Sequence, residues 1–200
     1  MSPHTRLPVP GTRQSLLAIA CTLLLAACTS PLVRDASPAA PRQLLSAFAV
    51  EGRLSATDGR EAASGRFEWV HAATHDRLTL YSPLGHIVAL LDGGPGGASL
   101  QTADGSRREA AGMDALLPEV LGVDLPAARL PRWIQAAPDE DAEVRALDAG
   151  GRPLLVFDHG WRIDYPGYAD DTAAAVPRRL EISRGDARVR LIIDSWTALP

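Results

Sequence analysis

The histidines of this sequence are the first residues to test for chemistry, and their spacing does not form a complete site. His71 and His75 are four residues apart, a spacing that holds a metal ion on a helix. The surrounding pattern is that of a strand and a turn, and no third ligand is fixed nearby. We interpret both as solvated turn histidines. His86 and His159 each stand alone beside turns.

Acidic side chains are concentrated in the segment 138–143, PDEDAE. Neighbouring side chains of a loop point outward and are hydrated, so a solvated link is favoured over a calcium site. Asp164 and Asp194 lie on expected strands, and nothing in their spacing predicts that they pair in a cleft.

The sequence contains no G-x-S-x-G, H-E-x-x-H or Walker motif. Its glycine-rich run, 93–97, lacks the lysine and the helix that follow in a phosphate-binding loop. We therefore expect neither an enzyme nor a bound cofactor or metal.

One thiol, that of Cys28, is placed for covalent modification. It follows Leu25-Ala26-Ala27 in a lipobox, and the apolar stretch over 16–27 comes after two arginines. That stretch is too short for a comfortable bilayer span and has the flanks of an export signal. We expect residues 1–27 to be a cleaved signal peptide and Cys28 to be lipidated.

The residue after the cysteine bears on the membrane that receives the protein. Thr29 stands there, whereas Asp is the usual retention mark for the inner membrane in enteric-type bacteria. The expected location is the outer membrane, with a lipid anchor and a domain facing the periplasm.

Composition limits the partners. The formal net charge is −4, there is no lysine, and removal of Arg6 and Arg13 with the signal makes the charge −6. This excludes nucleic acid as a favoured partner, and no polybasic segment is present to bind an anionic surface. Because Cys21 lies in the signal, the mature domain has no disulfide. We expect a monomer of one domain.

The segment 28–41 is rich in Pro, Ala and Ser and is expected to be a flexible tether. The folded domain is expected over 42–200, beginning with a short helix through Ser46. Period-two alternation then predicts about eleven short strands. The clean alternation indicates an antiparallel sheet with one wet face, and so many strands curl into a barrel or half-barrel. The fold class is therefore mainly β.

A helical insert interrupts the strands. Asp114 can cap a helix that runs to Leu121 and stops at Gly122, although Pro118 is expected to delay or bend it. A second helix is expected over Ala127–Ala136. The insert is apolar on one side, which places it across the mouth of the curled sheet.

Five short patterns occur in a specific order: F-x-W at Phe67 and Trp69, S-P-L-G at 82–85, L-G-x-x-L-P…L-x-x-W-I at 121–134, G-W-x-I-x-Y at 160–165, and D-x-W at 194–196. Together with the lipobox, this ordered set resembles the LolB family of outer-membrane lipoprotein receptors over essentially the whole mature domain. One departure is Ala136, where the family often has glycine, so a left-handed helix stop is less comfortable there.

The resemblance implies an unclosed antiparallel β-barrel of the LolA/LolB type, with an apolar cavity on its concave face and helices as a lid. It also implies that the protein takes lipoproteins from a LolA-type periplasmic carrier and inserts them into the outer membrane. Each methylene of a cargo acyl chain contributes about 0.8 kcal/mol when buried. Crossing water uncovered would cost on the order of tens of kcal/mol for the chains of one lipoprotein.

Acyl chains call for a cavity of aliphatic and aromatic side chains. The candidates on the expected apolar faces are Phe48, Val50, Phe67, Trp69, Leu80, Leu91, Trp133 and Ile134. For each of them plain core packing is the alternative, because alternation identifies the inward face and not the part of it that stays unfilled.

The S-P-L-G segment is a separate candidate. Pro83 fixes one turn residue and Gly85 can supply a positive φ, so Leu84 is expected at a turn tip. A large apolar side chain at an exposed tip does nothing for the fold. By the resemblance, Pro83, Leu84 and Gly85 belong to a protruding loop that inserts cargo into the membrane. The alternative is that Leu84 folds back onto the core.

Two other functions fit a lipid-anchored β-domain. A lipocalin-like binder of a small apolar ligand would hold its ligand without a protein donor. A structural lipoprotein of an outer-membrane assembly complex would have a docking patch and a filled interior.

Overall fold

The computed structural model describes residues 42–200. The expected signal peptide, Cys28 and the tether over 28–41 lie outside the described residues. None of the described helices is long and apolar enough to cross a bilayer.

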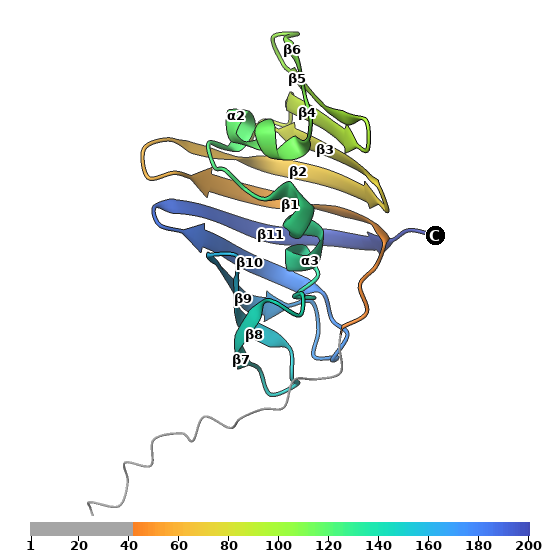
Figure 1. Ribbon diagram of the computed structural model, residues 1–200, viewed down its shortest axis with the longest axis vertical. Coiled ribbons are helices and arrows are strands. Elements are labelled where there is room, and N and C mark those ends of the chain that lie inside the picture. Colours follow the sequence, from red (N-terminus) through yellow and green to blue (C-terminus); the bar gives the residue numbers. More distant parts are fainter. Residues whose placement is uncertain (1–41) are drawn as a thin grey trace, which may run out of the picture. The chain divides into compact units, whose positions relative to one another are not determined.

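Eleven strands form one antiparallel sheet in the order β6-β5-β4-β3-β2-β1-β11-β10-β9-β8-β7 (Figure 1). In chain order the strands are β1 (Ala47–Thr57), β2 (Ala62–Ala72), β3 (His75–Tyr81), β4 (Ile87–Gly94), β5 (Gly97–Thr102), β6 (Arg107–Ala110), β7 (Glu143–Leu147), β8 (Pro153–Asp158), β9 (Trp161–Tyr168), β10 (Pro177–Arg184) and β11 (Ala187–Ala198). The predicted number and direction of the strands are confirmed.

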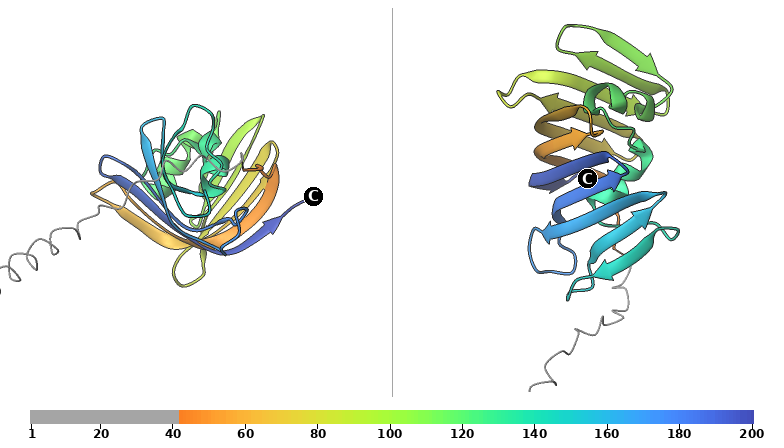
Figure 2. Two further views of the ribbon diagram at one scale, coloured as in Figure 1. Left: turned by 90° about the horizontal axis from the view of Figure 1, so that it is seen from below. Right: turned by 90° about the vertical axis from the view of Figure 1, so that its left-hand side faces the viewer.

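The sheet is strongly curved and does not close on itself. Its two edges are β6 and β7, which are not neighbours in the hydrogen-bonded order. Viewed along the row of strands, the sheet is bowed, and the helical segments lie inside the bow (Figure 2). The expectation of an unclosed barrel whose concave face carries a helical insert is confirmed.

The first and last strands form the middle of the sheet. β1 pairs with β11 along most of its length, and the register shifts between Glu51 and Gly52. A side chain at Gly52 would overlap the backbone carbonyl of Ile192, so glycine permits this close approach. The two halves of the sheet are joined through a pair of strands from opposite ends of the domain.

The first part of the insert differs from the prediction at its start. A 3₁₀ turn, η2 (Met113–Ala115), precedes α2 (Leu117–Leu121), so the helix begins late and Pro118 lies in its first turn. Asp114 does not cap α2; its carboxylate accepts a hydrogen bond from the backbone N–H of Ala127 at 2.6 Å. The predicted stop at Gly122 is confirmed, with a φ of 68°.

The helix expected over Ala127–Ala136 is present, but its first turn is 3₁₀ and it ends at Ile134. The segment divides into η3 (Ala127–Arg129) and α3 (Leu130–Ile134). Pro131 lies in the first turn of α3, where proline is tolerated, and its missing N–H removes one hydrogen bond to the preceding 3₁₀ turn. Ala136 lies in the left-handed region with a φ of 49°, the conformation for which glycine is better suited.

The short helix expected through Ser46 is also absent from the described residues. The side chain of Gln135 accepts a hydrogen bond from the N–H of Leu45 at 2.8 Å and donates one to its carbonyl at 3.2 Å. Both backbone polar groups of Leu45 are therefore bound by the residue that follows α3, instead of by a helical turn of their own.

The turn between β2 and β3 offers a stability test. Ala73 has a φ of 44° and an exposed side chain. Because a left-handed conformation strains a residue with a Cβ, Ala73→Gly should raise the free energy of unfolding by about 0.5 to 1 kcal/mol in urea titrations. Ala72→Gly, at an equally exposed strand position, is the matched control and should lower it. A loss of stability in Ala73→Gly would contradict the assigned turn.

Candidate functional site

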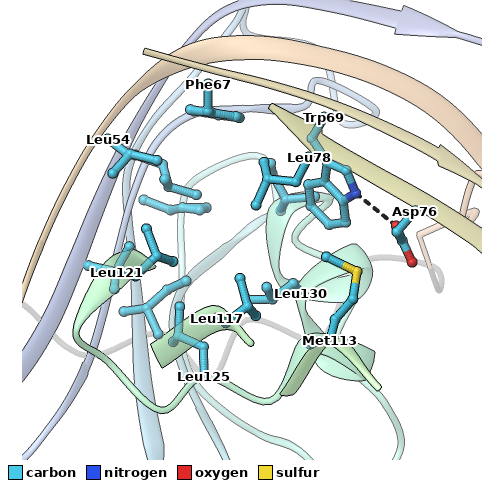
Figure 3. Close-up of a pocket in the computed structure, with 16 residues that line it drawn as sticks. Leu54, Phe67, Trp69, Asp76, Leu78, Met113, Leu117, Leu121, Leu125 and Leu130 are labelled. Carbon is cyan, nitrogen blue, oxygen red and sulfur yellow. Dashed lines mark hydrogen bonds between the residues drawn. The ribbon is translucent and has the colours of Figure 1, made fainter. Parts of the chain in front are cut away.

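An apolar cavity of about 70 Å³ lies between the concave face of the sheet and the insert (Figure 3). The insert contributes four leucines to its wall: Leu117, Leu121, Leu125 and Leu130. The strands contribute a second set of aliphatic side chains: Leu54, Leu78, Leu180, Ile182, Val189 and Leu191. Asp76 is the one charged residue among the sixteen that line it. This wall can hold hydrocarbon and offers almost nothing to a polar ligand.

The structure places only part of the nominated set at this cavity. Phe67, Trp69 and Ile134 line it, and Leu80 lines a smaller space beside it. Four of the nominated residues lie outside the lining and are packed in the core: Phe48, Val50, Leu91 and Trp133.

Aromatic packing accounts for two of these positions. The ring of Phe48 stacks on Trp196 at a centroid distance of 4.8 Å, and Trp133 packs against Trp161 at 6.1 Å. Other side chains therefore already cover the rings of Phe48 and Trp133, and both residues belong to the packed core.

Sequence reasoning missed most of the wall. Val189 and Leu191 alternate with Arg188 and Arg190, and this alternation was the signal that could have nominated them. Leu117 and Leu121 are four residues apart and lie on one face of α2, whereas Leu125 follows the helix stop at Gly122 and no helical period marks it. What the sequence did not supply was the point at which the insert crosses the sheet.

At one end the cavity adjoins a larger space of mixed polarity, here called the vestibule. It has a volume of about 320 Å³ and shares Asp76, Met113 and Ala127 with the cavity. The carboxylate of Asp76 accepts a hydrogen bond from the indole N–H of Trp69 at 2.7 Å, and His71 Nδ1 lies 2.8 Å from the same oxygen. The vestibule thus lies at the end of the cavity where Asp76 supplies the one charged group.

At the other end the cavity adjoins a narrow space of about 40 Å³, here called the side channel. It shares Leu54 and Leu121 with the cavity. Its remaining wall comes from the N-terminal half of β2, the junction of β3 and β4, and α2: Ala63, Ser64, Gly65, Arg66, Leu80, Tyr81, Val88 and Val120. The two neighbouring spaces differ in charge, because Asp76 and Asp114 border the vestibule and Arg66 is the one charged residue of the side-channel wall.

The α3 end of the insert is fixed to the sheet by buried polar contacts. Asp158, at the end of β8, is 1% exposed and accepts hydrogen bonds from Trp133 Nε1 at 2.6 Å and Arg129 Nη1 at 3.1 Å. The hydroxyl of Tyr165 donates to the backbone carbonyl of Trp133 at 2.9 Å. Breaking such contacts leaves buried polar groups unpaired, which is costly.

The α2 end is held differently. Among the described residues, the ion pairs from 116–126 to the sheet are Glu119 with Arg108 at 3.3 Å and Asp124 with Arg184 at 3.8 Å. Surface ion pairs of this kind contribute about 0 to 1 kcal/mol each. The α2 segment is therefore retained mainly by the contact of its leucines with the cavity wall.

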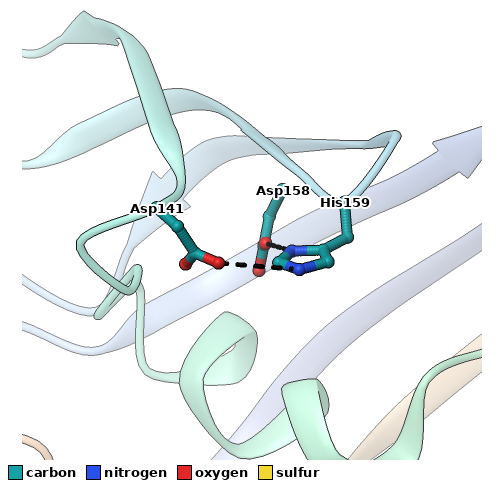
Figure 4. A group of neighbouring side chains, drawn as sticks. All are labelled: Asp141, Asp158 and His159. Carbon is teal, nitrogen blue, oxygen red and sulfur yellow. Dashed lines mark hydrogen bonds and ion pairs between the residues drawn. The ribbon is translucent and has the colours of Figure 1, made fainter.

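Asp141, Asp158 and His159 are close enough to one another to suggest a metal site (Figure 4). Arg129 supplies the positive charge in this group. Its guanidinium lies 2.8 Å from His159 Nε2, 3.1 Å from Asp158 and 3.6 Å from Asp141. His159 Nδ1 then donates to Asp158 at 2.6 Å. We interpret the group as an ion-pair network around a guanidinium.

This network sets the protonation of Asp158. Burial by itself raises the pKa of this carboxyl group, but hydrogen bonds from His159 and Trp133 and the charge of Arg129 outweigh burial. The pKa therefore lies below its ordinary value, and Asp158 is ionised at neutral pH. A charged acceptor strengthens the attachment of α3.

The other candidate residues do not assemble into one site. Asp164 pairs with Arg162, and Asp194 pairs with Arg53. His71 lies beside Asp76 and packs at 5.0 Å from the ring of Phe48, so it is not a solvated turn residue as expected. His75 is exposed, in agreement with the expectation.

The S-P-L-G turn presents its leucine to solvent. The N–H of Gly85 donates to the carbonyl of Ser82 at 2.9 Å, and Gly85 has a φ of 85°. Leu84 is 86% exposed, so its predicted position at the turn tip is confirmed and it does not fold back. The loop between β3 and β4 extends from the side of the sheet opposite the helices (Figure 2, right).

The family model for outer membrane lipoprotein LolB matches residues 46–196. The chain belongs to the LolB family. The outer-membrane lipoprotein LolB of Azoarcus sp. (strain BH72) is 51% identical over 189 residues, covering 94% of this chain and 97% of that protein. The LolB of Thiobacillus denitrificans is 40% identical over 163 residues, covering 81% and 86%.

Among solved structures, a LolA superfamily protein from Nitrosomonas europaea aligns with 80% of this chain and 89% of its own. The TM-score is 0.49 and the sequence identity is 9%.

In this LolB-family domain, Asp158→Asn tests the attachment of α3. The variant should lose about 3 kcal/mol of unfolding free energy at pH 7, because Arg129 and its neighbours would face a neutral group. The folded-state pKa of Asp158 is lowered, so its stabilisation is full above about pH 4 and is lost as the pH falls through the folded-state pKa. Urea titrations across this range measure the difference.

Asp164→Asn is the matched control, because Asp164 is paired with an arginine at the surface. It should cost less than about 1 kcal/mol. Equal losses in the two variants at pH 7 would contradict the assigned role of Asp158.

Proposed function

We propose that this protein is an outer-membrane lipoprotein receptor. It accepts lipoproteins from a LolA-type periplasmic carrier, covers their acyl chains and passes them into the outer membrane. The observation that carries the proposal is the apolar cavity between the concave sheet and the insert, in a chain of the LolB family. No step requires a cofactor or a covalent intermediate.

The small volume of the cavity indicates whether the structure is open or closed to acyl chains. Ligand-binding pockets commonly have volumes of about 300–1,000 Å³, whereas this cavity has about 70 Å³. The structure is therefore a closed form, in which leucines of the insert occupy the space that the acyl chains need. Cargo enters when part of the insert withdraws.

The contacts of the insert identify the part that withdraws. α3 is tied to Asp158 and Tyr165 by buried hydrogen bonds, whereas α2 is held by leucine contacts and exposed ion pairs. An incoming acyl chain replaces the apolar contacts that α2 gives up. This exchange keeps the free-energy change of opening small, because apolar area on the sheet stays covered in both states.

Delivery follows from the same balance. A bilayer covers every methylene of an acyl chain, and each contributes about 0.8 kcal/mol when buried. A cavity shared with protein side chains covers them less completely, so transfer from the receptor into the membrane is favourable. The affinity for acyl chains therefore rises from the carrier to the receptor, and from the receptor to the bilayer.

Anchoring completes the proposal. Residues 1–27 form a cleaved signal peptide, and Cys28 carries the lipid that holds the monomeric domain on the outer membrane, facing the periplasm. The segment 28–41 is the tether. Two or more acyl chains suffice for stable membrane attachment.

The small cavity volume favours one alternative, a structural lipoprotein of the outer membrane with a filled interior. Such a protein would have no affinity for lipoprotein acyl chains. A lipocalin-like binder would take a free apolar ligand and would not remove cargo from a carrier. Both alternatives are separated from the receptor by a transfer experiment.

The experiment mixes the mature protein carrying Cys28→Ser, which cannot be lipidated, with a LolA-type carrier loaded with a lipoprotein. We expect the cargo to appear on this protein in gel filtration or pull-down. Leu78→Glu, inside the cavity, should reduce the transfer at least tenfold because a buried charge excludes hydrocarbon. Thr79→Glu, on the opposite face of the same strand, is the control. Cargo that stays on the carrier would refute the proposal.

The exposed loop has its own test. We propose that Leu84 enters the bilayer surface and brings the cargo chains to it. Leu84→Glu should accept cargo from the carrier normally but deliver it to phospholipid vesicles at least fivefold more slowly, whereas Leu84→Phe should deliver normally. Normal delivery by Leu84→Glu would remove the loop from the mechanism.

A further inference from the structure

We propose that cargo acyl chains leave this protein sideways, through the side channel and along the base of the Leu84 loop. This inference rests on the proposed receptor function and adds a route and a set of residues to it. Among the described residues, the vestibule and the side channel both share lining residues with the cavity, and they differ in the kind of group that each can pass.

The wall of the half-barrel has a gap beside the side channel. β2 begins at Ala62, but its pairing with β3 covers only Arg66 to Ala72, because β3 ends at Tyr81. Residues 62–65 pair with β1 on one side only. The sheet therefore lacks a neighbouring strand where the chain leaves for the Leu84 loop.

The side channel lies at this gap. Ala63, Gly65 and Leu80 form its sheet side, and Val120 and Leu121 of α2 close it from the inside. Leu121 of α2 and Leu54 of β1 also line the cavity, so these two side chains lie between the two spaces. When α2 withdraws, the apolar wall becomes continuous from the cavity to the gap.

The outer end of this path carries exposed apolar side chains. Leu84 is 86% exposed, Ile87 is 55% exposed and Val88 is 39% exposed. Val88 is also part of the side-channel wall and lies in β4 where the register with β3 shifts. Exposed apolar side chains that are this close in the sequence are suited to contact with a membrane or a protein.

Two amphipathic side chains favour the membrane as the contact. The guanidinium of Arg66 lies 6.0 Å from the centre of the Tyr81 ring, and both residues border the side channel. Arginine and tyrosine place an apolar body beside hydrocarbon and a polar end beside lipid headgroups. They lie where the apolar tip would meet the bilayer surface.

The charges that border the vestibule and the side channel indicate which part of a lipoprotein each space can hold. The vestibule is bordered by Asp76, Asp114 and His71, which suit the peptide and the ester-linked head of a lipoprotein. The side channel has no acidic side chain in its wall, and its one charged residue is Arg66 at the rim. Hydrocarbon is therefore the occupant of the side channel, one chain at a time, while the polar head remains at the vestibule.

The test introduces a charge into the path without touching Leu84. Ala63→Glu and Val88→Glu should accept cargo from the carrier within twofold of the unmodified protein. Delivery to vesicles of phosphatidylethanolamine and phosphatidylglycerol should be at least fivefold slower. Val144→Glu, at a valine of β7 that is 37% exposed, is the matched control and should deliver normally.

A second measurement does not depend on how well those variants fold. A benzophenone attached to Ser64→Cys, in the side-channel wall, should capture cargo acyl chains after vesicles are added. The same probe on Ser195→Cys, at an exposed position of β11, should capture none. Both proteins carry Cys28→Ser, which leaves the probe site as the only cysteine of the mature chain.

The outcomes separate the route from the receptor function. Normal delivery by Ala63→Glu and Val88→Glu, with no capture at Ser64→Cys, would overturn the exit route while cargo acceptance still supports the receptor. If the unmodified protein takes no cargo from the carrier, the receptor function and the exit route fail together.

Discussion

The contact between the concave face of the sheet and the leucines of the insert is the constraint on which the rest of the structure depends. A sheet that must receive hydrocarbon has an apolar face that cannot stay open to water, since each Å² of exposed apolar surface costs about 25 cal/mol. Leu117, Leu121 and Leu125 cover that face. These leucines occupy the position that an acyl chain takes, so they must be displaced when an acyl chain binds.

This requirement explains why the insert is attached unevenly. A cover fixed at both ends could not move, and a cover free at both ends would expose the face or attract the wrong partners. Asp158 and Tyr165 hold α3 through buried hydrogen bonds, whereas α2 depends on apolar contact. Because α2 is the less firmly held end, the part that withdraws lies next to Leu54 and the gap beside β3. Withdrawal of α2 therefore opens both the cavity and the side channel.

Much of the architecture is predictable from alternation and turn chemistry, because both are local. Val189 and Leu191 reveal their face by period two, and Gly85 reveals a turn with Leu84 at its tip. What escapes prediction depends on distant partners. Gln135 hydrogen-bonds both backbone groups of Leu45, and the stacking of Phe48 on Trp196 removes Phe48 from the cavity. Alternation shows which residues point inward but not which remain uncovered.

The most direct measurement is the distance between spin labels on the insert and on the sheet, with and without bound lipoprotein. One label pair joins α2 to the sheet at Glu119→Cys and Arg179→Cys, and the other joins α3 to it at Arg132→Cys and Arg179→Cys. For the α2 pair, the account predicts a longer mean distance and a broader distance distribution when cargo binds. For the α3 pair, it predicts an unchanged distance. Unchanged distances for both pairs in the loaded protein would contradict it.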